Sequence, residues 1–392
     1  MKKIILFFLL VISFGHNSVA CLNIFYAYDK DGNPTKLTDL PAFHKNFDKE
    51  LYVGKIKQLE ARLKKDHNYM LLSDYSVCLM KLGKSAEALK LLIEIYKHYP
   101  NDYKIAANLG TAYELNGQAD SALKYIRRDI ELNPNDHDGS EWIHVKILET
   151  ELQLQKDPAY LTHNSVLQLS EKQKKDSMIC VQLYTQLQER VPFMPGPNPL
   201  MASLFTDLGD LSANTISVEF ARTYYLTAKE YYGDQSPALA EKIKAMQALT
   251  SKYMSQKLPP PTPGDEEYAD RNSLGYLSYK QILVNYDTQH YKINWQKINT
   301  DVPSLLSLVD FTKPAAVVKT NAVQSASPTD SLKLIPESRD SLNDSTSAEK
   351  AKASGFKKIA EANEPPSSVT FAVFLLIAIV GLVVSAFVFL TK

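Results

Sequence analysis

Residues 69–136, YMLLSDYSVCLMKLGKSAEALKLLIEIYKHYPNDYKIAANLGTAYELNGQADSALKYIRRDIELNPND, decide the fold of this chain because the second half of the stretch repeats the first. A step of 34 residues carries Gly83 onto Gly117 and Pro100 onto Pro134. A period of this size is typical of stacked helix-turn-helix units, each of which buries its apolar face against its neighbours. The stretch therefore predicts a repeat architecture.

Each half of the stretch carries the signals of two helices joined by a tight turn. Apolar residues recur at helical spacing on both sides of Gly83 and again of Gly117. Glycine ends a helix readily because it adopts positive φ at little cost. The proline that closes each half biases the residue before it away from helical geometry. We therefore expect two helical hairpins, residues 69–102 and residues 103–136.

These residues resemble the tetratricopeptide repeat pattern W-x2-L-G-x2-Y, then A-x3-F, then P. The second unit matches closely, with its tryptophan replaced, through Ala106, Leu109, Gly110, Tyr113, Ala122, Ile126 and Pro134. The first unit matches more loosely through Leu72, Tyr75, Ser76, Leu79, Ala88, Leu92 and Pro100. A degenerate third unit is predicted at residues 202–235, from Phe205, Leu208, Gly209, Ala221, Tyr225 and Ala228. The resemblance implies an all-α solenoid of helical hairpins with additional packed helices.

The same resemblance implies a binding surface, because the first helix of each unit lines the concave side of such a stack. It places these residues there: Ser73, Val77, Met80, Lys104, Asn108, Thr111, Glu114, Glu141 and Val145. One subgroup of the family clamps a partner's C-terminal carboxylate with lysine and asparagine. Asn108 fits a slot of that clamp, but Ser73 and Val77 occupy the first-unit slots, so the clamp is incomplete.

Further helices are expected on both sides of the repeats, so that the helical repeat domain spans residues 47–257. Amphipathic patterns predict a capping helix at 47–65 and a helix at about 140–156 with Ser140 as its N-cap. Later helical segments are expected at 162–192, 200–212, 216–232 and 237–256. Before all of them, residues 21–46 are predicted to form a small hairpin with Asp31-Gly32 at its turn.

Two faint metal patterns do not favour a metal site. A calcium-type spacing begins at Asp29, but the position of its acidic twelfth ligand is Leu40. His137 and His144 have no cysteine or carboxylate spacing to match, so structural roles are expected for both. We therefore expect no metal and no cofactor.

Composition bears on the remaining classes of function. Lys plus Arg and Asp plus Glu number 44 each, so the formal net charge is zero and nothing favours a nucleic acid as partner. The sequence has no nucleophile elbow, zinc-protease motif or phosphate loop, so the protein is not expected to be an enzyme. Cys78 and Cys180 are expected to be buried, with a disulfide bond between them left open.

The two ends of the chain carry export and membrane signals. Residues 1–20 have the charged start, short apolar run and small residues of a secretory signal peptide. For Cys21, acylation as in a bacterial lipoprotein and ordinary cleavage beside it both stay open. A proline-rich break opens a partly ordered segment at 258–311, and a disordered linker is predicted at 312–368. Val369–Leu390 is uncharged and long enough to cross about 30 Å of hydrocarbon as a transmembrane helix.

These signals predict an exported protein anchored in a bacterial envelope membrane, with most of the chain on the periplasmic face of the inner membrane. The alternative topology, a cytoplasmic protein anchored by its tail, would require an inert N-terminal segment. Residues 141–149, EWIHVKILE, resemble a phrase that follows repeats in exported proteins of Bacteroidota-like bacteria.

The predicted function is therefore that of a non-enzymatic scaffold that binds a protein or peptide. Two other classes stay open. One is an accessory subunit of an envelope enzyme or transport complex with a site in residues 257–311. The other is a self-associating architectural protein, for which Gly381 and Ser385 supply small-residue spacing in the membrane helix.

Overall fold

The structure, a computed structural model, describes residues 24–37, 39–261, 271–286 and 291–314. All of them lie within one compact unit, Met1–Arg339. The predictions for the signal peptide, Cys21, most of the linker and the Val369–Leu390 helix fall outside the described residues. Within the described ranges, no helix has both the length and the apolar character needed to cross a membrane.

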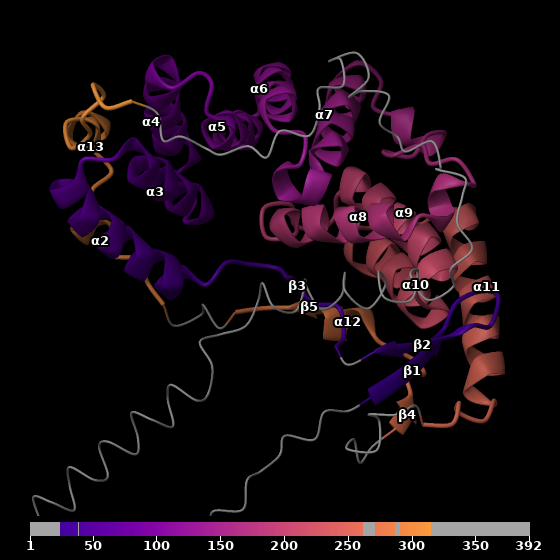
Figure 1. The fold of residues 1–392 in the computed structure, drawn as a ribbon. Coiled ribbons are helices and arrows are strands. Elements are labelled where there is room, and N and C mark those ends of the chain that lie inside the picture. The colour runs from indigo at the N-terminus through magenta and orange to yellow at the C-terminus, as the bar shows by residue number, and fades with distance from the viewer. Residues whose placement is uncertain (1–23, 38, 262–270, 287–290, 315–392) are drawn as a thin grey trace, which may run out of the picture. The chain divides into compact units, whose positions relative to one another are not determined.

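The described part is mainly helical (Figure 1). Its helices are α2 (Lys49–Asp66), α3 (Tyr69–Lys81), α4 (Ser85–His98), α5 (Tyr103–Leu115), α6 (Ala119–Leu132), η1 (Asp136–Gly139), α7 (Glu141–Lys156), η2 (Tyr160–Thr162), η3 (Gln173–Lys175), α8 (Ser177–Arg190), α9 (Pro199–Thr215), α10 (Val218–Leu226), η4 (Thr227–Tyr231), α11 (Pro237–Met254), α12 (Tyr279–Ile282), η5 (Trp295–Lys297) and α13 (Val302–Leu306). Its strands are β1 (Ile24–Tyr28), β2 (Pro34–Leu37), β3 (Phe43–His44), β4 (Arg271–Ser273) and β5 (Leu283–Val284).

The two predicted hairpins are present, and their local chemistry repeats with the sequence. The side chain of Asn68 accepts a hydrogen bond from the Met70 amide at the start of α3, at 2.9 Å. Asp102, 34 residues later, caps α5 in the same way through the Lys104 amide at 3.0 Å. Such caps satisfy amides that have no partner inside the helix. The first helix of each repeat therefore starts with the same kind of side-chain N-cap.

Glycine permits the turn inside each hairpin. Gly83 has φ of 88° and Gly117 has φ of 72°, in the left-handed region that side chains disfavour. The residue after each glycine donates a backbone hydrogen bond to the preceding helix. The Lys84 amide donates to the Leu79 carbonyl at 2.8 Å, and the Gln118 amide donates to the Tyr113 carbonyl at 3.0 Å. The predicted helix-ending role of both glycines is confirmed.

A second kind of glycine sets how closely paired helices approach. A Cβ added to Gly110 would lie 2.6 Å from the Ile126 side chain across the α5–α6 pair. A Cβ on Gly209 would lie 2.3 Å from the ring of Tyr225 across the α9–α10 pair. Both pairs have the same sequence offset, so the α9–α10 hairpin repeats the close contact of the second unit. This supports a third, degenerate hairpin close to the predicted 202–235.

Most other helix predictions agree with the structure, and two details do not. The ends of α2, α7, α9 and α11 lie within three residues of the predicted ends. The segment 162–192, predicted to hold one or two helices, contains α8 and the short η3 turn. Ser140 makes no cap hydrogen bond, since its hydroxyl donates to the His137 carbonyl at 2.7 Å. Cys78 and Cys180 are buried, as expected, but both are free thiols, so the disulfide alternative is wrong.

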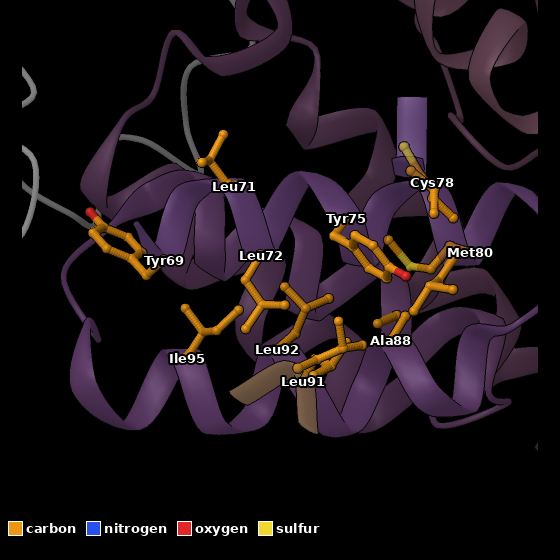
Figure 2. Close-up of a cluster of buried hydrophobic side chains, with 14 of the residues drawn as sticks. Tyr69, Leu71, Leu72, Tyr75, Cys78, Met80, Ala88, Leu91, Leu92 and Ile95 are labelled. Atoms are coloured by element: carbon orange, nitrogen blue, oxygen red, sulfur yellow. The ribbon is translucent and has the colours of Figure 1, made fainter. Parts of the chain in front are cut away.

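The first repeat is the centre of an extended apolar cluster (Figure 2). Side chains of α3 and α4, among them Leu72, Tyr75 and Leu92, are fully buried against one another. Helix α2 adds Ile56 and Leu63 to the same cluster. The predicted role of residues 47–65 as a capping helix is therefore confirmed by packing, since α2 covers an end that the repeats alone would leave exposed.

A distant segment, residues 291–313, also belongs to this cluster and is here called the strap. It contributes the buried residues Ile298, Leu305 and Val309 to the core of the first repeat. The strap overlaps the segment 258–311, which was predicted to be partly ordered, and the first residues of the predicted linker. Near its end, the carbonyl of Lys313 accepts a hydrogen bond from the Tyr99 hydroxyl at 3.0 Å.

Polar contacts hold the strap along α4. The Trp295 ring lies 5.1 Å from the ammonium of Lys84, before the first residue of α4. The Phe311 ring stacks on His98, the last residue of α4, at 4.4 Å. Between these points the Tyr75 hydroxyl donates to the Asn299 carbonyl at 2.6 Å. The strap therefore follows α4 from one end to the other.

Small sheets join the N-terminal segment to residues after the helices. The predicted hairpin is confirmed, since β1 and β2 pair antiparallel with Phe25 opposite Leu37. However, β1 also pairs in parallel with β4, and β3 pairs in parallel with β5. These short pairings add to a fold that is otherwise helical, as the predicted all-α class expects. Sequence patterns could not show these strands, because two or three residues carry no usable alternation.

We predict that the strap is a major source of stability. Leu305→Ala removes a fully buried side chain and should lower the free energy of unfolding by about 2–5 kcal/mol in urea denaturation. The control Leu51→Ala removes a side chain that is 47% exposed on α2 and should change it by less than about 0.5 kcal/mol. Equal effects of the two substitutions would contradict the core role of the strap.

Candidate functional site

The predicted binding residues lie on the first helices of the repeats, here called the first-helix face (the nine positions predicted above on α3, α5 and α7). Its part on α3 and α5 is accessible. Lys104 is exposed, and Val77, Asn108 and Thr111 are half-buried. Ser73 is buried beneath them and accepts a hydrogen bond from the Asn108 amide nitrogen at 3.0 Å. This bond fixes the orientation of the Asn108 side chain between the two repeats.

The other predicted positions are covered. Met80 and Val145 are buried within apolar clusters of the repeats. The carboxylates of Glu114 and Glu141 are only 8% and 6% exposed. Each contacts one ring nitrogen of His144 on α7, and side chains of α8 that the sequence did not place here bond both carboxylates. The first-helix face therefore has an open part and a part closed by charged groups.

Glu114 is the centre of the closed part. Its two carboxylate oxygens lie 2.5 Å and 3.4 Å from the two terminal nitrogens of Arg190, at the end of α8. Its Oε2 also lies 2.7 Å from Nε2 of His144 on α7. A carboxylate with two cationic partners and almost no exposure to water is stable only as a complete set. Glu114 therefore ties α5 to α7 and α8 at once.

Glu141 extends the network to the loop before α7. Its Oε2 lies 3.1 Å from Nδ1 of His144, and its Oε1 lies 2.7 Å from Nδ1 of His137. The amide nitrogen of Gln186 donates to the same Oε1 at 3.1 Å. Both ring nitrogens of His144 thus face carboxylate oxygens, which only accept hydrogen bonds. His144 must carry both protons and a positive charge.

Helix α8 meets this network through one polar stripe. Gln182, Gln186 and Arg190 follow one another at intervals of four residues, so they share one face of the helix. Gln182 donates to the carbonyls of Asp138 and Gly139, at 3.2 and 3.0 Å. The stripe therefore contacts the loop, α7 and α5 in succession.

The charges shift the pKa values of the central pair in opposite directions. Burial alone would raise the pKa of Glu114, but the charges of Arg190 and His144 outweigh it and lower the pKa to about 2. Burial and Arg190 oppose the charged form of His144, yet Glu114 and Glu141 raise its pKa above the ordinary value. The network is thus ionised throughout the neutral range.

Two further carboxyl groups beside the network are destabilised as anions. Burial, with the charge of Glu114, raises the pKa of Glu151 to about 7. Burial, with the charges of Asp136 and Glu141, raises the pKa of Asp129 to about 8. Among the described residues, neither carboxyl oxygen of Asp129 has a hydrogen-bond partner. Both carboxyl groups therefore change between their neutral and charged forms near neutral pH.

The histidines of the network bond carboxylates. No group of three His, Cys, Asp or Glu side chains in the described ranges has the geometry to hold a metal ion. His137 and His144 engage carboxylates instead, which agrees with the structural roles predicted for them. At the hairpin turn, both carboxylate oxygens of Asp29 accept hydrogen bonds from Asn33, and one also accepts from Asp31. Hydrogen bonds from within the loop therefore occupy the carboxylate of Asp29.

Arg190 and Gln186 are the functional residues that sequence reasoning missed. They lie outside the repeats, and nothing in the 34-residue period points to them. The available signal was the spacing of Gln182, Gln186 and Arg190 at intervals of four residues on one helix. That spacing marks a polar contact face, although it does not name the helix that the face meets.

The geometry defines a protein of helical-hairpin repeats with a polar first-helix face. A family model described as tetratricopeptide repeat matches residues 67–141, which confirms the resemblance over the two hairpins. The match ends at the first residue of α7, so it does not extend to α8–α11. No curated protein is similar enough to the chain to count as a match.

We predict that the Arg190–Glu114 pair is essential to the fold. Arg190→Met should lower the free energy of unfolding by about 3–5 kcal/mol, because it leaves the buried Glu114 without its main partner. The matched control Arg128→Met breaks a pair with Glu131, whose side chain is 53% exposed, and should cost less than about 1 kcal/mol. Chemical denaturation measures both, and a small effect of Arg190→Met would refute the assignment.

The Arg190–Glu114 pair also predicts that the free energy of unfolding decreases at acidic pH. The pKa of Glu114 is lower in the folded protein, so its stabilisation is present above the ordinary carboxyl pKa and is lost as pH falls toward about 2. Glu114→Gln should flatten the decline in unfolding free energy between about pH 5 and pH 2.5. An unchanged decline in this variant would show that other carboxyl groups cause it.

Proposed function

We propose that the protein is a non-enzymatic scaffold that binds a protein or peptide partner on the open part of its first-helix face. The observation that carries the proposal is the tetratricopeptide repeat match over residues 67–141, since repeats of this family generally mediate interactions between proteins. The residues proposed to contact the partner are Val77, Lys104, Asn108 and Thr111. Each is accessible and lies on a first helix of a matched repeat.

The chemistry of this surface suits an extended polar segment. Asn108 is held by Ser73, so less side-chain entropy is lost when its amide meets a partner. Thr111 lies one turn further along α5 and adds a hydroxyl, while Lys104 adds a cation on the same helix. Val77 supplies an apolar contact from α3. The partner would then lie across both repeats.

We further propose that the scaffold is exported and anchored by Val369–Leu390 at the periplasmic face of a bacterial inner membrane. The support is the sequence alone, namely the secretory pattern at 1–20 and the uncharged length of the C-terminal stretch. An anchored scaffold would hold its partner close to the membrane, within reach of the linker that precedes the anchor.

Site-specific photocrosslinking tests the binding proposal. A photoreactive phenylalanine at Thr111 should form one discrete adduct in the native cells, whereas the same group at Lys124, exposed on α6, should not. The double variant Asn108→Ala/Lys104→Glu should weaken binding of the identified partner by at least about tenfold, or ~1.4 kcal/mol. Equal adducts from both positions, or unchanged affinity of the double variant, would argue against this face.

Cell fractionation tests the anchoring proposal separately. The full chain should stay with membranes after alkaline carbonate extraction, and removal of residues 369–390 should transfer it to the soluble fraction. Retention of the shortened chain on the membrane would exclude these residues as the main anchor.

A further inference from the structure

Helix α2 presents a basic surface to solvent, although the chain as a whole is neutral. The formal net charge of the chain is zero, whereas α2 has six basic and three acidic side chains, a local net charge of +3. The acidic residues are Glu50, Glu60 and Asp66, and the basic ones are Lys49, Lys55, Lys57, Arg62, Lys64 and Lys65. All of the basic residues except Lys49 are exposed. The excess positive charge of α2 therefore faces the solvent.

Most of the exposed cations form two rows along α2. Lys57 and Lys64 are seven residues apart, which is close to two helical turns, so they lie on one side of the exposed surface. Lys55 and Arg62 have the same spacing and lie on the other side. Between the rows runs an uncharged stripe that consists of Leu51, Gly54, Gln58 and Ala61. Leu51 is 47% exposed, so the stripe includes an accessible apolar side chain.

Few carboxylates neutralise these rows. Glu60 lies 2.7 Å from the ammonium of Lys64, and Asp66 lies 3.9 Å from the guanidinium of Arg62, whose side chain is 62% exposed. The charge of Arg62 also acts on Asp74 of α3. Pairs this exposed to water contribute little and leave both partners accessible. Three further cations of α2 have no ion pair among the described residues, namely Lys55, Lys57 and Lys65.

The described part of the chain ends beside the same helix. The ammonium of Lys313, at the end of the strap, donates to the carbonyl of Asp66, the last residue of α2, at 3.1 Å. Residues 315–368 follow, and after them comes the uncharged stretch Val369–Leu390. The stretch that is proposed to anchor the chain is therefore connected to the repeats at the end of α2.

We propose that the outer face of α2, formed by the two basic rows and the stripe between them, docks on a membrane of anionic phospholipids. This face is here called the α2 basic face. The proposal rests on the proposed anchoring by Val369–Leu390. Phosphate groups of the lipids match the two rows of cations, and Leu51 meets the lipid surface between them.

The proposed anchor favours this contact by keeping α2 close to lipid. Residues 315–368 number 54, and a flexible chain of that length spans roughly 40 Å. The lipid surface is then always within reach, so several weak charge contacts suffice for docking. Docking fixes the α2 end of the repeats against the membrane.

A polarity-sensitive label tests the contact in the full-length chain. Leu51→Cys is labelled with nitrobenzoxadiazole, and the chain without this substitution, treated alike, gives the background, since Cys78 and Cys180 are buried. In nanodiscs of phosphatidylcholine with about 30% phosphatidylglycerol, the emission should shift to the blue. In pure phosphatidylcholine, or in salt of about 1 M, it should match that of a label in water.

Matched variants assign the effect to the α2 basic face. The same label at Gln58, on the stripe, should also shift, whereas a label at Gln247, exposed on α11, should not. Lys57→Gln/Lys65→Gln should lower the ratio of docked to undocked protein by about tenfold or more. The control Lys244→Gln/Lys252→Gln removes two exposed cations of α11 and should leave this ratio unchanged.

The outcomes separate the docking from the anchor. A label that stays in water on both lipids, in a chain retained by the nanodiscs, would overturn the docking and leave the anchor supported. An equal shift on both lipids would contradict the role of charge. A shift that appears only when polyglutamate is added would assign the α2 basic face to an acidic protein instead. A chain that does not enter the nanodiscs would refute the anchor and the docking together.

Discussion

A stack of only two helical hairpins has two apolar ends, and the burial of these ends is the constraint on which the rest of the structure depends. Each hairpin hides one face against its neighbour and cannot hide the other. At the start of the stack, α2 and the strap cover the first repeat, with Leu63 and Leu305 both fully buried. After the second repeat, α7 covers α6 through Val145 and Leu148. The additional helices are thus a requirement of the fold.

The strap and helix α8 contact the repeats through different kinds of interaction. The strap adds apolar side chains, whose burial is largely indifferent to pH. Helix α8 brings Arg190 and Gln186 to the buried carboxylates of Glu114 and Glu141, an arrangement that is strong only when every partner is present and correctly charged. The first repeat is therefore built as a permanent core. The joint beyond the second repeat is built from groups that can change their charge.

The sequence predicted the repeats well because their period encodes them redundantly. Gly83 and Gly117, the closing prolines Pro100 and Pro134, and Gly110 are each a local signal, and all agree with one fold. The packing of the strap could not be predicted, because the spacing of Ile298, Leu305 and Val309 does not show which helices they pack against. Their burial comes from a contact with residues more than 200 positions earlier, such as Tyr75 with Asn299.

The accessibility of the first-helix face was predicted only in part. The open positions Lys104, Asn108 and Thr111 follow from the period, so the resemblance placed them on the first helix of the second repeat. It could not foresee that Glu114 and Glu141 would be covered, since Arg190 reaches them from outside the repeats. Burial by a distant segment leaves no trace in the sequence of the segment that is buried.

Native-state hydrogen exchange of the full-length protein, read by mass spectrometry, tests most directly whether the strap completes the first repeat. The Asp310 amide bonds the His67 carbonyl at 3.0 Å, and the Leu305 amide bonds Asp301 at 3.0 Å. These amides should exchange with the same free energy of opening as those of α3 and α4, and should respond equally to added denaturant. Exchange of the strap at the rate of a free peptide, with α3 and α4 still protected, would contradict the account.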